Sequence, residues 1–327
     1  MTILGIETTC DETGVAIVSD GRKIICNFVA SSAALQSKSG GIVPELAARE
    51  QIKFMTPLLS RANSTFRFEK LDAIAVACGP GLVGSLLIGV ESAKTLSLVL
   101  NKPLIAVNHL IGHIVGCWIE EVKNTPEFPV VALVVSGGHT DLLLMQDFNN
   151  YKWLGGTRDD ACGEAFDKVA RMLGLEYPGG PEIENMAKTV KKRSFGIMLS
   201  RPMIHDKNFD FSFSGIKTQV ANIVDKSALT KNLICEIAFE FQQAVCDVLV
   251  AKTLRAASLF GAKSICVSGG VSANSTLREK FEDSNFNVYF PEKKLSVDNG
   301  AMIAAAAFFK KDFVNSLELQ VSPGLHF

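Results

Sequence analysis

Apolar and polar positions follow the same order in two separate parts of the chain. Short apolar runs lie at residues 3–9, 14–18 and 23–29, and again at residues 130–136, 141–145 and 150–154. Runs this short and rich in β-branched residues are typical of strands joined by tight turns. The pattern predicts a three-stranded meander used twice. Two similar lobes are therefore expected, with a cleft between them that the polar turns line.

Beyond each meander, the apolar positions alternate between helical spacing and short continuous runs. The expected helices cover residues 44–61, 82–100 and 109–121 in the first half, and residues 160–173, 216–224, 229–260, 273–281 and 299–310 in the second. The expected strands between them cover residues 73–77, 104–107, 264–267 and 286–290. This order predicts an α/β protein.

A proline-containing polar stretch at residues 124–129 separates the two halves. We expect one lobe at residues 1–125 and a second at residues 126–327, with a helical insertion at about 175–260 and the last helix packing back toward the first lobe. The layout resembles the actin-like (ribonuclease H-like) ASKHA superfamily of ATPases and sugar kinases. This resemblance implies two tandem lobes with a nucleotide between them.

Composition narrows the class of protein. The 327 residues are 47% apolar and 20% charged with a net charge of −1, so no global field attracts a polyanion. Eight cysteines without a CxxC pair favour a reduced, cytoplasmic protein, and the chain shows no secretory signal. The uncharged stretch at residues 73–90 reaches spanning length, but Gly79, Pro80 and Gly81 interrupt it, so no membrane segment is expected.

Two of the five histidines stand four residues apart. His109 and His113 share one face of the expected helix and can bind one metal ion, with Asp298 before the last helix as a candidate third ligand. Unrelated core histidines and a helix-capping aspartate are the alternatives. A zinc protease of the HExxH type would need a glutamate where this chain has Leu110.

Glycine-rich loops follow several expected strands. Residues 79–84 match GxGxxG, but no acidic residue follows to hold a ribose hydroxyl, so a tight strand-to-helix turn is the favoured interpretation. Residues 136–140 and 268–274 each combine paired glycines with Ser, Thr or Asn. Such loops let main-chain amides approach phosphate, and their occurrence in both positions favours nucleotide binding.

Charged residues mark two more candidate surfaces. Asp11 and Glu12 lie at the first meander turn, where they are ordinary turn carboxylates or catalytic groups. Basic residues gather in the insertion and form either a solvated face or a phosphate-binding patch: Lys188, Lys191, Lys192, Arg193, Arg201, Lys207 and Lys217.

Ten ordered motifs together resemble the TsaD family of tRNA adenosine threonylcarbamoyltransferases. They lie at residues 9–13, 41–45, 79–82, 109–113, 136–140, 160–168, 177–181, 211–218, 268–274 and 298–304. The resemblance implies metal ligands at His109, His113 and Asp298. It implies nucleotide and substrate contacts at Val135, Ser136, Gly137, Gly138, His139, Asp167, Gly180 and Asn274. The chain departs from the family pattern at Ile111 and at Ser296 and Val297, without loss of a ligand.

The resemblance also implies an activity. Family members are acyltransferases that move the threonylcarbamoyl group from threonylcarbamoyl-AMP to N6 of adenosine 37 in tRNAs reading codons that begin with A, with AMP released. We expect one divalent metal ion (iron or zinc, with magnesium as an alternative), Asp11 and Glu12 as catalytic residues, and tRNA contacts at Lys191, Lys192 and Arg193.

The expected partners are tRNA, a TsaB-like paralogue, a TsaE-like ATPase and a TsaC/Sua-type enzyme that supplies the adenylate. Two other functions remain open from the residues alone: an actin-like nucleotide switch ATPase and a zinc metalloprotease.

Overall fold

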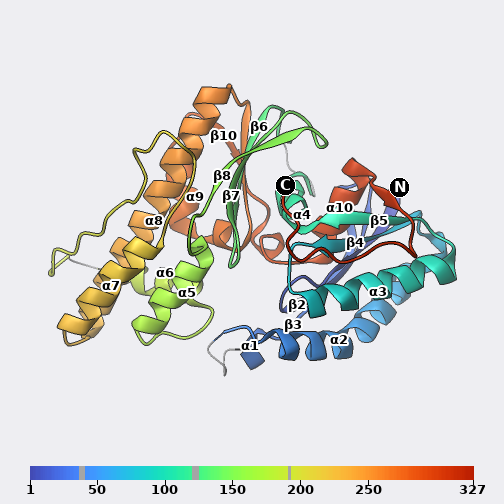
Figure 1. Cartoon of the computed structure of the whole chain (residues 1–327), viewed down its shortest axis with the longest axis horizontal. Coiled ribbons are helices and arrows are strands. Elements are labelled where there is room, and N and C mark those ends of the chain that lie inside the picture. The colour runs from blue at the N-terminus through green and yellow to red at the C-terminus, as the bar shows by residue number, and fades with distance from the viewer. Residues whose placement is uncertain (37–40, 120–124, 191–192) are drawn as a thin grey trace. The chain divides into compact units, whose positions relative to one another are not determined.

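The structure, a computed structural model, describes residues 1–36, 41–119, 125–190 and 193–327. The chain forms two compact units (Figure 1). Unit 1 contains Met1–Thr125 together with Pro291–Phe327, and unit 2 contains Pro126–Phe290.

Unit 1 is built on a six-stranded sheet with the order β11-β5-β4-β1-β2-β3. Strands β1, β2 and β3 form an antiparallel meander, β4 and β5 continue the sheet in parallel from β1, and β11 closes it antiparallel to β5. The strands are β1 (Thr2–Glu7), β2 (Glu12–Ser19), β3 (Lys23–Ser31), β4 (Ala73–Gly79), β5 (Leu104–Asn108) and β11 (Phe313–Val314).

Unit 1 also contains helices, most of which contact its sheet. They are α1 (Ala33–Gln36), α2 (Pro44–Thr65), α3 (Val83–Leu100), α4 (His109–Val115) and α10 (Gly300–Lys310), with 3₁₀ turns η2 (Phe68–Lys70), η3 (Gly116–Trp118) and η5 (Lys293–Leu295). Helix α10 lies directly against β1 and β2. A Cβ atom on Gly5 would lie 2.2 Å from the Gly300 carbonyl oxygen, and one on Gly14 would lie 2.6 Å from the Gly300 nitrogen. Glycine at all three positions permits this close approach.

The last helix explains why residues 291–327 belong to unit 1. The sequence places this segment in the second lobe and expects its helix to pack back toward the first. In the structure the segment joins unit 1, because α10 is buried along most of its length from Gly300 to Ala307 and supplies the cover over β1 and β2.

Unit 2 repeats the meander of unit 1. Its five-stranded sheet has the order β10-β9-β6-β7-β8, with β6, β7 and β8 antiparallel and β9 and β10 continuing in parallel from β6. The strands are β6 (Val130–Val135), β7 (Thr140–Met145), β8 (Tyr151–Gly156), β9 (Ser264–Ser268) and β10 (Asn287–Tyr289). Both sheets therefore follow the duplicated α/β layout predicted from the apolar pattern.

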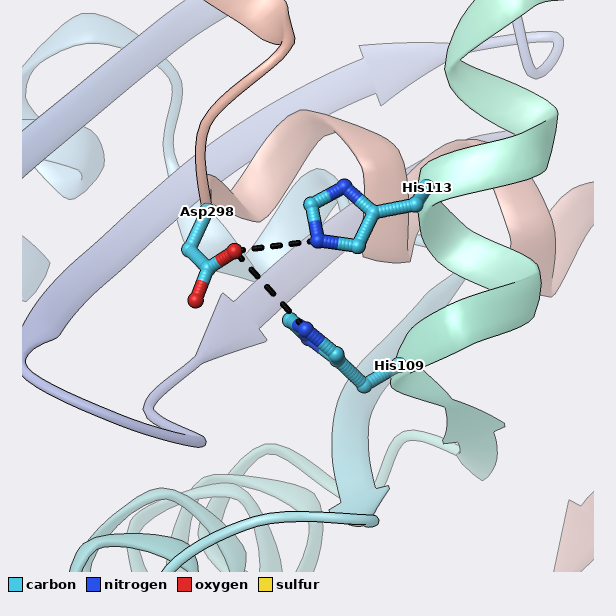
Figure 2. Close-up of side chains that lie close together, drawn as sticks. All are labelled: His109, His113 and Asp298. Atoms are coloured by element: carbon cyan, nitrogen blue, oxygen red, sulfur yellow. Dashed lines mark ion pairs between the residues drawn. The ribbon is translucent and has the colours of Figure 1, made fainter. Parts of the chain in front are cut away.

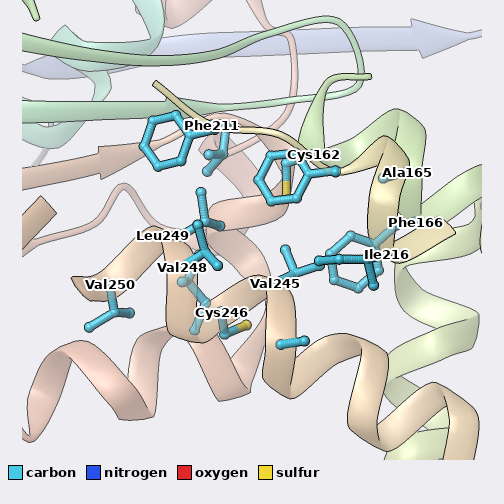
Figure 3. Packing of buried hydrophobic residues seen from close by; sticks show 14 of the residues in the cluster. Cys162, Ala165, Phe166, Phe211, Ile216, Val245, Cys246, Val248, Leu249 and Val250 are labelled. Atoms are coloured by element: carbon cyan, nitrogen blue, oxygen red, sulfur yellow. The ribbon is translucent and has the colours of Figure 1, made fainter. Parts of the chain in front are cut away.

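A second set of helices belongs to unit 2, where the longest helix contacts the sheet and the others pack against helices. They are α5 (Cys162–Met172), α6 (Gly179–Lys188), α7 (Ser214–Lys226), α8 (Lys231–Phe260) and α9 (Ser275–Glu282), with the 3₁₀ turn η4 (Gly270–Ala273). Figure 3 shows the buried core between these helices, where Phe166 of α5 packs near Val245 of the long helix α8. This core fixes the position of α5 relative to the loops at the ends of the strands.

Helix α3 is the single described helix that is long and apolar enough to cross a membrane. Its residues Leu86, Val90 and Ala93 are fully buried in unit 1. A Cβ atom on Gly89 would lie 2.2 Å from Thr8 Oγ1, so α3 touches the end of β1. We therefore regard α3 as a core helix of a globular unit.

Candidate functional site

Helix α4 begins where β5 ends and presents two histidines on one face. The side chain of Asn108 caps the helix, because its Oδ1 accepts hydrogen bonds from the main-chain N–H groups of Leu110 at 2.8 Å and Ile111 at 3.4 Å. His109 and His113 follow one turn apart and are both buried, with 5% and 2% of their surface exposed. The helix spacing therefore brings the imidazoles together as the sequence predicts.

Asp298 reaches the same point from the loop before α10. Its Oδ1 lies 3.0 Å from His113 Nε2 and 3.7 Å from His109 Nε2 (Figure 2). One ligand atom from each of the three residues lies within 4.8 Å of the others. The helix cap that was an alternative role for Asp298 belongs to Asn299, whose side chain accepts from the Met302 N–H.

The donor set fits a divalent metal ion. His113 is buried, yet within the described residues neither of its ring nitrogens makes a hydrogen bond of acceptable geometry, although Nε2 faces Asp298. A buried imidazole without a well-formed hydrogen bond is unfavourable unless a further partner completes the site. Two imidazole nitrogens and one carboxylate oxygen suit several transition metals. The group could therefore bind a metal ion.

Glu7 contacts the ring nitrogen of His109 that does not face Asp298, and the sequence did not identify Glu7 as a site residue. Its Oε2 lies 3.0 Å from His109 Nδ1, and its Oε1 accepts a 2.6 Å hydrogen bond from the Thr9 N–H. Glu7 is fully buried. The available signal was a single carboxylate at the end of an otherwise apolar strand. A carboxylate behind a ligating histidine is the usual second partner in metal sites.

Negative charge concentrates around the histidines. Burial alone would lower the pKa of His109, but Glu7 and Asp298 outweigh it and raise that pKa to about 9. Burial raises the pKa of Glu12 to about 10, and the charges of Asp298, Asp11 and Glu7 add to this effect. A bound cation would relieve this repulsion.

Asp11 and Glu12 lie where β1 turns into β2, in the same unit as the histidines. Asp11 is buried, and its carbonyl oxygen accepts from the N–H of Ser32 at 3.1 Å. Glu12 is partly buried and begins β2. The charges of Asp298 and Asp11 both act on Glu12, so this turn lies close enough to Asp298 for an electrostatic interaction.

The two glycine-rich loops of unit 2 lie side by side. They follow β6 and β9, which are parallel neighbours, so their carboxyl ends meet at one edge of the sheet. Gly269 approaches β6 so closely that a Cβ atom there would lie 2.4 Å from the Val135 carbonyl oxygen, and its φ of +86° favours glycine. The Ser136 carbonyl oxygen accepts from the N–H of Gly163 at the start of α5. Gly137 and Gly138 are exposed.

The other predicted nucleotide contacts adjoin these loops. Asp167 on α5 accepts a 2.7 Å hydrogen bond from the Gly179 N–H at the start of α6, beside Gly180, where a Cβ atom would meet nothing within 4 Å. Asn274 caps α9 through the Leu277 N–H. The motif at residues 177–181 leads into α6, which is not among the expected helices and has Pro178 at its N-cap, since proline suits the start of a helix.

The predicted tRNA contacts are only partly described. Lys191 and Lys192 lie outside the described residues. Arg193 forms an ion pair with the buried Glu240 at 2.8 Å and donates to the Ile197 carbonyl oxygen at 2.6 Å. Arg193 therefore has a structural role in holding its own segment.

Solved structures with similar architecture show the fold. Full-length HypF in its phosphate- and nucleotide-bound form matches with a TM-score of 0.61 and 17% identity, covering 95% of this chain and 46% of that one. Component A of the (R)-2-hydroxyglutaryl-CoA dehydratase of Acidaminococcus fermentans matches with a TM-score of 0.54 and 14% identity, covering 95% and 99%. These likenesses confirm the predicted ASKHA fold.

Relatives named tRNA N6-adenosine threonylcarbamoyltransferase are similar over nearly the whole chain. The protein of Moorella thermoacetica is 46% identical, covering 99% of this chain and 96% of the relative. That of Persephonella marina is 46% identical, covering 94% and 90%. That of Dictyoglomus turgidum is 45% identical, covering 99% and 98%.

The family model described as TsaD, tRNA N6-adenosine threonylcarbamoyltransferase, matches residues 23–305. This range includes His109, His113 and Asp298. The chain therefore belongs to the TsaD family, the acyltransferases that form N6-threonylcarbamoyladenosine in tRNA.

Proposed function

We propose that the chain transfers the threonylcarbamoyl group from threonylcarbamoyl-AMP to N6 of adenosine 37 in tRNAs reading codons that begin with A, and releases AMP. The observation that carries this proposal is the buried group of His109, His113 and Asp298, supported by Glu7, in a member of the TsaD family. The reaction joins a weakly nucleophilic amine to a mixed anhydride. The protein has to hold the adenylate, polarise the acyl carbonyl and remove one proton.

His109, His113 and Asp298 are proposed to hold one divalent ion, iron or zinc, with magnesium as an alternative. When bound, such an ion supplies Lewis-acid polarisation of the acyl carbonyl and orients the donor. Glu7 keeps the Nδ1 proton of His109, so that Nε2 points toward Asp298.

Asp11 is proposed to accept the proton from the attacking amine. Glu12 suits this role less well, because a pKa of about 10 keeps its carboxyl protonated at neutral pH until a cation offsets the neighbouring charges. In its protonated form Glu12 can donate a hydrogen bond to the substrate or to Asp11. The two carboxyl groups of one turn would thus have different roles.

The loops of unit 2 are proposed to bind the adenylate. Main-chain N–H groups at Gly137 and Gly138 are exposed and suit phosphate oxygens, with Val135, Ser136 and His139 completing the loop. Asp167, Gly180 and Asn274 adjoin this loop through α5, α6 and α9 and suit the ribose and base.

The proposed partners are tRNA, a TsaB-like paralogue and a TsaE-like ATPase, with the adenylate supplied by a TsaC/Sua-type enzyme, in the cytoplasm. The ion pair of Arg193 with Glu240 leaves Lys191 and Lys192 as the better candidates for tRNA phosphates.

The purified chain is tested with its partners, unmodified tRNA, threonine, bicarbonate, ATP and the adenylate-forming enzyme, and tRNA nucleosides are measured by mass spectrometry. We expect threonylcarbamoyladenosine from the wild type and from a His205→Ala control, which alters an exposed histidine of unit 2. The His113→Asn variant should lose bound metal and product together.

Nucleotide hydrolysis without modified tRNA would instead favour a switch ATPase, and cleavage of an added protein substrate would favour a protease. Full product formation by a His113→Asn variant that retains no metal would contradict the proposed metal site.

A further inference from the structure

The backbone turn that carries Asp11 and Glu12 is held at five consecutive carbonyl groups. Protein donors reach the carbonyl oxygens of residues 8, 9, 10, 11 and 12, and these donors come from several elements of unit 1: Gln51 Nε2, Leu82 N, Ser85 Oγ, Ser32 N and Ser32 Oγ. A turn between two strands does not need such support to form. The tethering therefore points to a turn whose exact conformation matters.

Gln51 contributes more to this network than any other side chain. Its Nε2 lies 2.8 Å from the Glu12 carbonyl oxygen, 3.1 Å from that of Cys10 and 3.4 Å from that of Thr8. Since one amide nitrogen carries two protons, the longest contact is the weakest of the three. One side chain thus connects alternate residues along the entire turn.

Gln51 is also a polar residue at a buried position of α2, where the helical pattern otherwise has apolar residues. The buried positions of α2 form one stripe, and Gln51 is the polar member among Ala47, Gln51, Met55, Leu58 and Ala62. Gln51 is fully buried, and within the described residues its Oε1 has no hydrogen-bond partner. Burying an amide with an unpaired oxygen is unfavourable, so an apolar residue would serve helix packing better. The carbonyl contacts explain why glutamine occupies this position.

We propose that Gln51 is a positioning residue that holds the turn of residues 8–12 in the conformation required for acyl transfer. This inference rests on the proposed roles of Asp11 and Glu12. Gln51 acts through the backbone, because its Nε2 contacts main-chain carbonyl oxygens of the turn. Losing its donors would allow the turn to shift, and a displacement of a catalytic group by about 1 Å can cost on the order of 100-fold in rate.

The test is the variant Gln51→Met, which preserves side-chain length and removes both donors. We expect kcat for threonylcarbamoyladenosine formation to fall by about 10- to 100-fold. The KM values for tRNA and for threonylcarbamoyl-AMP should stay within about twofold of wild type, because the loops that bind the adenylate are untouched.

The matched control is Met55→Ala, one turn further along the same buried stripe of α2. It removes apolar packing and lowers the melting temperature but leaves the three carbonyl contacts in place. Its kcat, measured well below its melting temperature, should match wild type. An equal loss of kcat in both variants would attribute the effect to loosening of α2 and overturn the proposal, as would a Gln51→Met variant with wild-type kcat.

Asp11→Asn is measured in parallel to separate two kinds of failure. Absence of product from the wild type would reject the proposed function itself. An inactive Asp11→Asn beside a fully active Gln51→Met would reject the positioning role alone. Should Gln51→Met not fold, Gln51→Asn shortens the side chain by one methylene while retaining the amide, and wild-type kcat in that variant would equally overturn the proposal.

Discussion

The carboxylate of Glu7 determines which nitrogen of His109 is available to a metal. Because Glu7 Oε2 lies 3.0 Å from Nδ1, the proton of the neutral imidazole resides on Nδ1 and the lone pair resides on Nε2. Thr9 Oγ1 lies 3.2 Å from the same nitrogen and helps to orient the ring. A residue outside the ligand set thus prepares one of the ligands.

Replacing Glu7 with glutamine is expected to weaken metal binding by about 10- to 100-fold. The amide removes the negative charge that makes His109 a more basic ligand and permits either tautomer. The measurement is a competition titration of zinc against a chelator of known affinity, which does not depend on activity.

The control for this change is Glu91→Gln, a Glu-to-Gln replacement on α3 at a largely exposed side chain that pairs with Lys94 at 2.9 Å. Its zinc affinity should equal that of wild type. Equal affinity in Glu7→Gln would mean that the helix alone orients His109.

The sequence predicts the candidate metal ligands better than it predicts the residues that position them. His109 and His113 share a face because of helical spacing, and Asp298 precedes an apolar helix, so local pattern was sufficient. Glu7 ends an apolar strand and Gln51 lies on the buried stripe of α2, and their partners lie 102 and 39 residues away. Their roles depend on tertiary contacts that no local pattern contains.

At the scale of elements, two buried glutamates of helix α8 hold residues 193–201 in place. Glu236 accepts from the N–H groups of Ser194 at 2.6 Å, Phe195 at 2.9 Å and Ile197 at 3.1 Å. Glu240 pairs with Arg193 and Arg201 of the same segment. The carboxylates of α8 thereby accept main-chain hydrogen bonds from residues 193–201, which form no strand.

The Glu236→Gln variant is expected to be less stable than wild type by about 1–3 kcal/mol at pH 7, because the new amide cannot accept all of these bonds. Burial alone would raise the pKa of Glu236, but the main-chain donors outweigh it and hold that pKa below its ordinary value of 4.5. Its contribution is therefore fully present above pH 4.5 and is lost as the pH falls below that value.

Urea denaturation at pH 7 and near pH 4 measures both effects. The difference in unfolding free energy between wild type and Glu236→Gln should narrow at the lower pH. Glu282→Gln on α9, an exposed position, serves as the control and should match wild type at both values. If the difference in unfolding free energy between wild type and Glu236→Gln were the same at both pH values, the charge of the Glu236 carboxylate would not account for it.

Helical periodicity predicted most elements but not all of their ends. The expected helix at residues 109–121 gives way to a 3₁₀ turn at Gly116–Trp118, within the part that is described. Helix α6 lies in the expected helical insertion but is not among the expected helices, because Pro178 and Pro181 at its start obscure the helical pattern. In both places glycine permits more than one backbone conformation, and packing selects among them.

At the scale of the whole molecule, unit 1 is assembled from two segments of chain separated by all of unit 2. Helix α10 from the second segment covers β1 and β2 of the first. The same segment supplies Asp298 to the histidines of α4. The sheet and the candidate metal centre both depend on this return of the chain.

A fragment of residues 1–125 is therefore expected to lack a cooperative thermal transition and to bind zinc weakly, because it lacks both α10 and Asp298. Circular dichroism during heating and a zinc titration measure the two properties.

Joining Thr125 to Pro291 through a short Gly/Ser linker restores the whole of unit 1 and provides the control. This chimera should melt cooperatively and bind zinc. Cooperative melting of residues 1–125 alone, at the temperature of the chimera, would show that α10 is not needed to complete the sheet.

Helix α10 is made late during synthesis on the ribosome. Strands β1 and β2 emerge long before Gly300–Lys310 does. At typical elongation rates the apolar surface of these two strands stays uncovered for roughly half a minute. A nascent polypeptide shorter than 298 residues lacks one of the three candidate ligands. Translation must thus be almost finished before His109, His113 and Asp298 are all present in the polypeptide.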